Sequence, residues 1–118
     1  MVNKEDNIKW SEKKNKQLIQ ALLSLKTTDE ASRFLRDLMT EYEIKEFANR
    51  LEAAKLLSQG VYYDAIIENT GLSSATIARI KKWLKGSLGG YRLILARLSP
   101  STHHHNPFKL GKGLSLTR

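Results

Sequence analysis

A cluster of basic side chains lies between Ser73 and Lys85, in the second half of the sequence. It contains Arg79 together with Lys81, Lys82 and Lys85. A guanidinium group can donate two hydrogen bonds to one guanine or hold a phosphate, whereas a lysine ammonium group contacts phosphate as a point charge. The chemistry that these residues offer is the binding of a polyanion.

The rest of the second half has the same charge bias. Up to Glu68 the sequence holds eleven basic and twelve acidic residues, and after Glu68 it holds nine basic residues and no acidic ones. Such asymmetry is typical of nucleic-acid binding, although an ordinary solvated basic surface also produces it. Proteins that read single-stranded RNA usually carry aromatic residues clustered on a sheet. This sequence shows no such pattern, so double-stranded DNA is the favoured partner.

Two short helices are expected on either side of Gly71, over 63–69 and 74–85. Gly71 can adopt the positive φ of a tight turn, and Ser73 is placed to cap the second helix. The apolar residues spaced to hold the two helices together are Ile67, Leu72, Ile77 and Ile80. The segment of about 63–85 is thus typical of a helix-turn-helix, whose second helix enters the major groove. The structural alternative is an ordinary helical hairpin with a basic outer face.

The outer side of the second helix begins with small residues, which let the backbone approach base edges. The predicted DNA contacts are Ser73, Ser74, Ala75, Thr76, Ala78, Arg79, Lys81, Lys82 and Lys85. Within this set, Arg79 is expected to read a base and Lys82 to hold a phosphate.

Four more helices are expected from apolar residues at helical spacing. They cover 11–25, a stripe from 31 to 39, 40–58 and 91–98. The two predicted capping boxes, in which a pair of side chains satisfies backbone N–H groups at a helix start, are Thr27 with Glu30 and Thr40 with Glu43. Gly60 is expected to end the third of these helices, and Gly89 with Gly90 to form a flexible joint before the last. The fold class is therefore all-α, with about six helices.

Catalysis and metal binding find little support in the sequence. Cysteine is absent, which excludes disulfides, a thiolate nucleophile and Cys-based zinc sites. The histidines, His103–His105, lie in a stretch rich in Ser, Thr, Pro and Gly, where disorder is a better interpretation than metal binding. No carboxylate pair has a nucleophile beside it. We expect no catalytic residue, no metal and no enzyme activity.

The first nine residues are charged, and no apolar stretch approaches the roughly 20 residues needed to cross a bilayer. We therefore expect a cytoplasmic protein without membrane contact. It would have one helical domain over 1–98 and a disordered basic tail over 99–118.

Taken together, these segments resemble the Trp repressor superfamily, and within it the YerC/YecD-type Trp repressor-like proteins. The resemblance covers about 18–95, and its most specific parts are 22–26, 47–57 with Gly60, and 70–79. It implies an intertwined homodimer, two DNA-reading domains on a palindromic operator and a role as a nucleoid-associated bacterial transcriptional repressor. The apolar first helix, with Leu18, Ile19 and Leu22, agrees with a dimer, whereas a monomeric bundle is the alternative.

The resemblance also matches Arg50 and Arg79 to the two arginines that hold tryptophan in the Trp repressor. In that repressor a glycine follows the second arginine and a serine stands three residues later, whereas this sequence has Ile80 and Trp83. We therefore expect neither a tryptophan co-repressor nor another cofactor, although a small anion between the arginines stays open. Arg50 is expected to pair with Glu46 or Glu43 instead.

A second class of function fits the same helices. The chain could be a helical, dimeric protein-interaction module with only weak or non-specific nucleic-acid binding. Exposure of Arg79 and Lys82 would favour DNA, and a second chain covering them would favour the interaction module.

Overall fold

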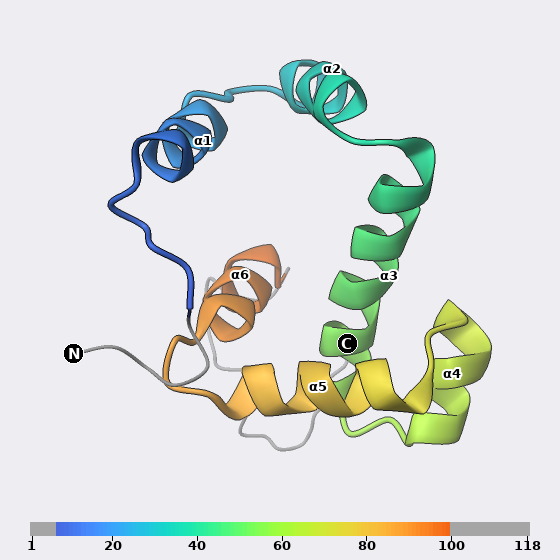
Figure 1. Ribbon diagram of the computed structural model, residues 1–118. Coiled ribbons are helices and arrows are strands. Elements are labelled where there is room, and N and C mark those ends of the chain that lie inside the picture. The colour runs from blue at the N-terminus through green and yellow to red at the C-terminus, as the bar shows by residue number, and fades with distance from the viewer. Residues whose placement is uncertain (1–6, 100–118) are drawn as a thin grey trace. The chain divides into compact units, whose positions relative to one another are not determined.

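The computed structural model describes residues 7–99, and within that range it contains helices and no strands (Figure 1). The six helices are α1 (Lys13–Leu23), α2 (Thr28–Leu38), α3 (Glu41–Ser58), α4 (Tyr63–Thr70), α5 (Ser74–Lys85) and α6 (Gly90–Leu98). The predicted all-α class is confirmed. The expected tail beyond Ser99, with His103–His105, lies outside the described residues.

Helix boundaries follow the predicted ones closely, with the largest differences in α1. That helix begins at Lys13 rather than Ser11, because Glu12 is extended and provides no side-chain cap. It ends at Leu23, where the N–H of Ser24 bonds back to the carbonyls of Gln20 and Ala21. The expected range 11–25 was therefore too long, because it followed the apolar residues past the last helical turn.

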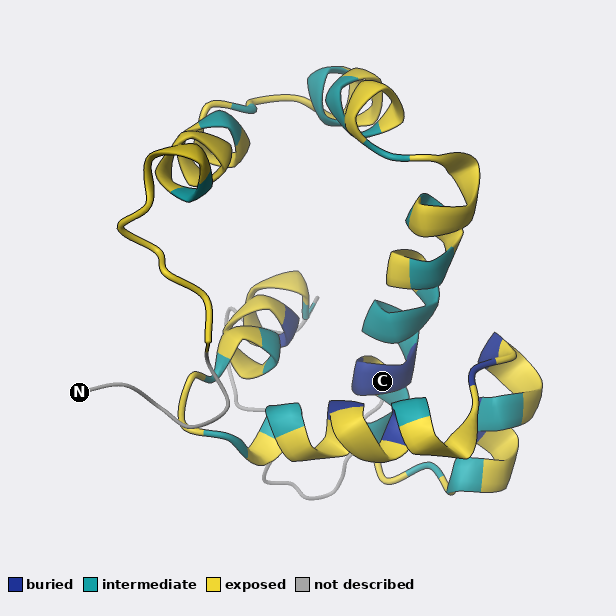
Figure 2. Ribbon diagram, viewed as in Figure 1, coloured by how far each residue is buried: buried dark blue, intermediate teal, exposed yellow. Residues whose placement is uncertain are grey.

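The chain divides into two compact units, residues 1–40 and 41–118. The first unit contains α1 and α2, and no residue between 7 and 40 is buried (Figure 2). The two helices do not pack closely against each other. Their large apolar residues are therefore left open, among them Leu18, Ile19, Leu22 and Leu23.

Helix α2 is stabilised by local interactions. The Thr27 hydroxyl accepts a hydrogen bond from the Glu30 N–H at 3.0 Å, as the predicted capping box requires. The Glu30 carboxylate reaches back one residue further than expected and accepts from the N–H of Lys26 at 2.9 Å. Arg33 and Asp29 form an ion pair at 3.0 Å across one turn. These contacts hold the helix without any tertiary packing.

The second unit has a core. Helices α4 and α5 pack against α3, and α6 packs against both α3 and α5 (Figure 1). The buried apolar residues are Ala53, Ala54, Ile66, Leu72, Ile77, Ile80 and Leu95. Two small alanines on α3 let the helices that cross it approach closely. Each fully buried isoleucine contributes roughly 1.5–3 kcal/mol of hydrophobic stabilisation.

Candidate DNA-binding interface

The turn between α4 and α5 is fixed by Thr70 and Gly71. Gly71 has φ +75° and ends α4 in the left-handed conformation, as predicted. The buried Thr70 hydroxyl donates to the Ile66 carbonyl at 2.7 Å and accepts from the N–H of Leu72 at 3.2 Å. One side chain thus joins α4 to the residue after the glycine. Thr70 was not among the residues predicted from the sequence, although a threonine directly before a turn glycine is a usable signal.

Ser73 caps α5, as the sequence predicted. Its hydroxyl accepts from the N–H of Thr76 at 3.1 Å and donates to the Thr76 hydroxyl at 3.0 Å. Among the predicted DNA contacts, Ser73 and Thr76 are thus engaged with each other at the start of the helix. Thr76 still has its own hydroxyl proton to donate.

Helix α5 has two faces of opposite character (Figure 2). Ile77 and Ile80 are buried in the core, and Trp83 and Leu84 are half-buried. The exposed residues are Ser74, Ala75, Ala78, Arg79, Lys81, Lys82 and Lys85. All of these were predicted as contacts, and the structure places them together on the outer side of one helix. Exposed small residues at the helix start leave room for base edges.

The charged residues of α5 differ in their surroundings. Arg79 makes no hydrogen bond or ion pair with any residue in the range 7–99. The Lys81 ammonium group lies 5.7 Å from the centre of the Tyr63 ring, a cation–π contact that links α5 to α4. Lys82 and Lys85 lie in the last turn, where positive charge suits the helix dipole. Arg79 is thus the cation best placed to bind something outside the chain.

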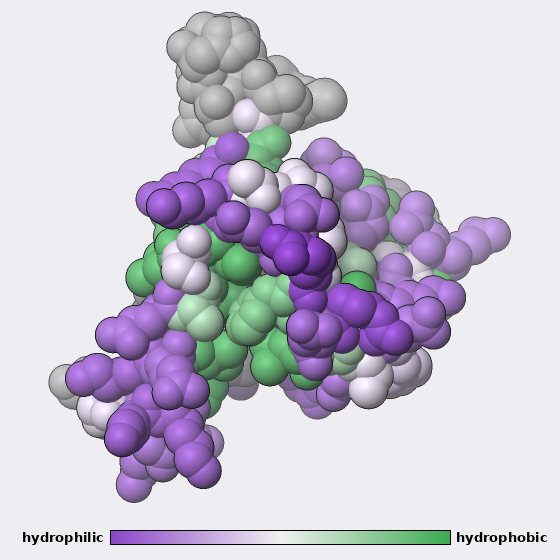
Figure 3. Space-filling view, turned by 90° about the horizontal axis from the view of Figure 1, so that it is seen from above, coloured by the Kyte–Doolittle hydropathy of each residue, from purple (hydrophilic) through white to green (hydrophobic). Residues whose placement is uncertain are grey.

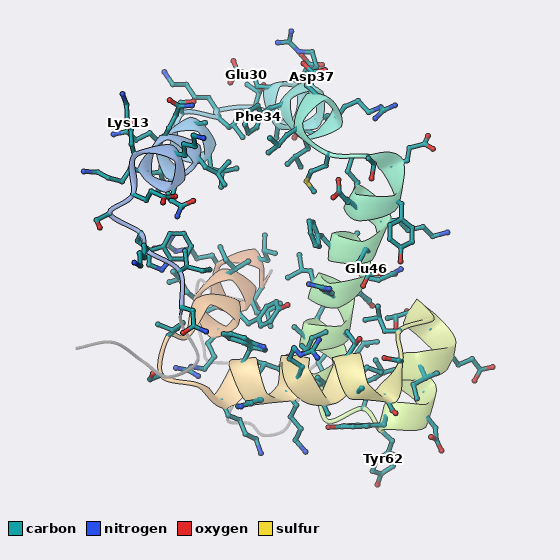
Figure 4. The ribbon with its side chains drawn as sticks, in the orientation of Figure 1. Lys13, Glu30, Phe34, Asp37, Glu46 and Tyr62 are labelled. Carbon is teal, nitrogen blue, oxygen red and sulfur yellow. The ribbon has the colours of Figure 1, made fainter. Side chains whose placement is uncertain are left out.

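Helix α4 carries the opposite charge. Asp64 and Glu68 are both exposed on it, and α4 contains no basic residue. Tyr62, just before α4, is 85% exposed and projects outward (Figure 4). A phosphate backbone would therefore be attracted to α5 rather than to the acidic side chains of α4.

Arg50 lies on α3 and has partners of its own. Its Nε atom is 3.5 Å from a carboxylate oxygen of Glu46, so the predicted ion pair with Glu46 is confirmed (Figure 4). Its guanidinium carbon lies 5.4 Å from the centre of the Phe47 ring. Burial raises the pKa of the Tyr91 phenol, and the positive charge of Arg50 lowers it by less. None of these contacts of Arg50 involves Arg79.

Two further properties of the described residues concern metal ions and membranes. Between residues 7 and 99, no three His, Cys, Asp or Glu side chains come together as metal ligands would. None of the described helices combines the length and apolar character that a bilayer span requires.

Helices α4 and α5 pack on the core through their inner faces and are joined by a turn that the Thr70 hydroxyl holds, and α5 has a basic outer face. This arrangement defines a helix-turn-helix protein. The sequence model of the Trp repressor protein family matches residues 13–99. The chain therefore belongs to the Trp repressor family, which is a family of helix-turn-helix DNA-binding regulators rather than enzymes.

Relatives and solved structures agree with this assignment. The uncharacterized protein YerC of Bacillus subtilis (strain 168) is 43% identical over 82 residues, which cover 70% of this chain and 79% of YerC. A TrpR-like protein from Eubacterium eligens superposes with a TM-score of 0.72 at 40% identity, over 75% of this chain and 92% of that one. A solved structure from Staphylococcus aureus gives a TM-score of 0.66 at 38% identity, over 70% and 82% of the two chains.

Proposed function

We propose that the chain is a transcriptional repressor that binds a specific double-stranded DNA sequence with α5 in the major groove. The observation that carries this proposal is the outer face of α5. It exposes small residues at the helix start and an unpaired Arg79 one turn later, and the helix contains no acidic residue. The buried Thr70 hydroxyl fixes the turn before α5, and a fixed turn suits a helix that must enter the major groove at one angle.

Base reading is assigned to Arg79 and phosphate binding mainly to Lys82. Arg79 lies on the same side of α5 as Ala75, away from the buried Ile77 and Ile80. Its planar guanidinium can satisfy both acceptors on one guanine edge, a geometry that lysine cannot reproduce. Lys82 lies nearer the end of the helix, where side chains usually meet the DNA backbone.

We propose further that the chain acts as an intertwined homodimer on a palindromic operator. Between residues 7 and 40 no side chain is buried, although α1 presents Leu18, Ile19 and Leu22 at its surface. Apolar side chains lie open on the face of the molecule seen in Figure 3. Helices of this length are marginal in water without packing, so a second copy of the chain is the natural cover. Two symmetric heads then meet two symmetric half-sites.

L-Tryptophan is not expected to act as a co-repressor. Ile80 is buried in the core, Trp83 is half-buried, and Arg50 is engaged by Glu46 and Phe47. An indole would have to displace these groups. Calorimetry with the full chain should therefore show no tight tryptophan binding, and a strong exothermic response would contradict this part of the proposal.

The proposal is tested by selecting bound sequences from a random duplex pool, then measuring variants on the selected and on random DNA across a salt series. Arg79→Ala should cost about 1–3 kcal/mol on the selected sequence and much less on random DNA. Lys82→Ala should weaken both DNAs alike and lower the salt slope by roughly one unit. Lys45→Ala, which removes an exposed lysine from α3, is the control and should change neither.

Two results would contradict the assignment. If Arg79→Ala weakens both DNAs equally, Arg79 is a phosphate contact rather than a base reader. If affinity is flat between low and physiological salt and no sequence is enriched, the chain is not an operator-binding protein. The protein-interaction module would then be the better account of the same fold.

A further inference from the structure

Arg92, on α6, reaches back to the end of α5. Its Nη1 atom donates hydrogen bonds to the carbonyl of Leu84 and, at 2.9 Å, to the carbonyl of Gly86. Leu84 is in the last turn of α5, and Gly86 is its C-terminal cap. The last four carbonyls of a helix have no partner within the helix, so a donor from elsewhere is needed to satisfy them. Arg92 supplies that donor for two carbonyls at once.

The charge of Arg92 suits this place. The C-terminal end of a helix carries a partial negative charge, and a cation held against it is stabilising. Hydrogen bonds from a charged donor are also stronger than those between neutral groups. The contact therefore ties α6 to the end of α5 more firmly than a neutral side chain would.

The loop before α6 is shaped around the guanidinium group. Gly89 has φ +70° and caps α6, a conformation that residues with a side chain rarely adopt. A Cβ atom built at Gly89 would also lie 2.8 Å from an Nη atom of Arg92. Gly89 is thus needed for its backbone conformation, and a side chain at this position would also require the end of Arg92 to shift. At the predicted joint, Gly89 forms the cap and Gly90 is the first residue of α6.

We propose that Arg92 is a positioning residue for DNA binding, which clamps the end of the reading helix α5 to α6 and does not itself contact phosphate. The proposal rests on the function proposed above for α5. Arg92 is one of the nine basic residues after Glu68, and its guanidinium group is directed at backbone carbonyls at the end of α5. Arg97, an exposed arginine on the same helix, is the matched residue without this contact.

The test combines hydrogen exchange of the free protein with DNA binding across a salt series. Arg92→Met removes the hydrogen bonds and the charge, whereas Arg92→Lys keeps the charge and loses the forked donor. Both should lower the exchange protection of the last-turn amides of α5 by about tenfold, the loss expected for a charge-assisted hydrogen bond. Both should weaken binding to the selected DNA while leaving the salt slope unchanged, because no phosphate contact is lost. Arg97→Met should leave α5 protection unchanged.

The opposite pattern would overturn the clamp. If Arg92→Met leaves the exchange protection of α5 unchanged, Arg92 does not clamp this helix. If Arg92→Met lowers the salt slope by about one unit and Arg92→Lys restores the slope, Arg92 is a phosphate contact. If Arg92→Met does not fold, the comparison of Arg92→Lys with the unmodified chain tests the clamp. If the unmodified chain binds no duplex, the proposed function fails, and the exchange measurements alone then judge the clamp.

Discussion

The two units of the chain are stabilised by different kinds of contact. In residues 7–40 no side chain is buried, and α2 depends on a capping box and an ion pair. In residues 41–99 the helices share seven buried apolar residues, two of them isoleucines with almost no exposed surface. A helix cap or an exposed ion pair contributes a few tenths to about 1 kcal/mol to stability, whereas burial of a large apolar side chain contributes several times more.

This difference indicates what each unit is for. The second unit already buries the residues that hold α5, so the reading head does not need help to keep its shape. The first unit leaves leucines and isoleucines open that a folded protein normally covers, and its helices are short. We infer that the first unit completes its packing only in the proposed dimer, and the variants below test this division.

The largest expected effect is in the core of the second unit. Ile77→Ala removes a fully buried side chain that joins α5 to the core, and should lower the free energy of unfolding by about 2–5 kcal/mol. Leu23→Ala, at a residue that is 80% exposed in the first unit, should cost the monomeric chain less than about 0.5 kcal/mol. Urea unfolding at a protein concentration low enough to keep the chain monomeric measures both. Equal costs would show that the burial contrast does not govern stability.

The second effect concerns association. Leu22→Glu places a charge among the apolar residues of α1 and should weaken the proposed dimer by tenfold or more, about 1.4 kcal/mol. Gln20→Glu adds the same charge on the opposite side of the helix and should leave association unchanged. Sedimentation over a concentration series distinguishes them. A monomeric unmodified chain, or a dimer indifferent to Leu22→Glu, would mean that this face of α1 is not the interface.

A smaller effect comes from the two helix caps, which use the same chemistry in different units. Ser73→Ala should lower the global free energy of unfolding by about 1 kcal/mol, because α5 is part of the core. Thr27→Ala should reduce hydrogen-exchange protection within α2 by a similar free energy and leave α5 amides unchanged. If both variants lower protection in all six helices equally, the two units unfold as one.

The sequence predicted the helices of the second unit well, because their ends are marked by residues with strong positional preferences, a glycine after one helix and a capping serine before the next. Gly71 and Ser73 define the turn, and α5 was placed over the same residues that it occupies in the structure. The outer face of α5 followed from helical spacing alone. The ion pair of Arg50 with Glu46 was also predictable, since the two residues lie one turn apart.

The features that escaped prediction depend on tertiary contacts or on backbone carbonyls. The Thr70 hydroxyl joins α4 to the turn residue Leu72 through backbone groups. The Arg92 guanidinium binds carbonyls six and eight residues away, and no side-chain pattern reveals that contact. Helical periodicity also could not predict what packs against α1. An amphipathic stripe indicates that the helix needs a partner, but it does not identify the partner.

The smallest effect uses tyrosine ionisation at alkaline pH as a probe of the second unit. All four tyrosines of the chain lie after residue 41, so none reports on α1 or α2. Burial raises the pKa of the Tyr91 phenol in the folded chain, and the nearby Arg50 offsets part of that rise. The unfolded chain therefore loses this proton at a lower pH than the folded chain. The protonated phenol contributes its full stabilisation below the ordinary tyrosine pKa of about 10, and this stabilisation falls as pH rises further.

Tyr91→Phe should flatten this alkaline loss of stability by about a few tenths of a kcal/mol or more, measured by urea unfolding between pH 8 and 11. Arg50→Gln should steepen it, because the charge that favours the phenolate is removed. Tyr62→Phe, at a residue that is largely exposed, serves as the control and should reproduce the unmodified curve. If Tyr91→Phe follows the unmodified chain at every pH, the packing of α6 against α3 does not bury this phenol in solution, and the second unit is looser than its core suggests.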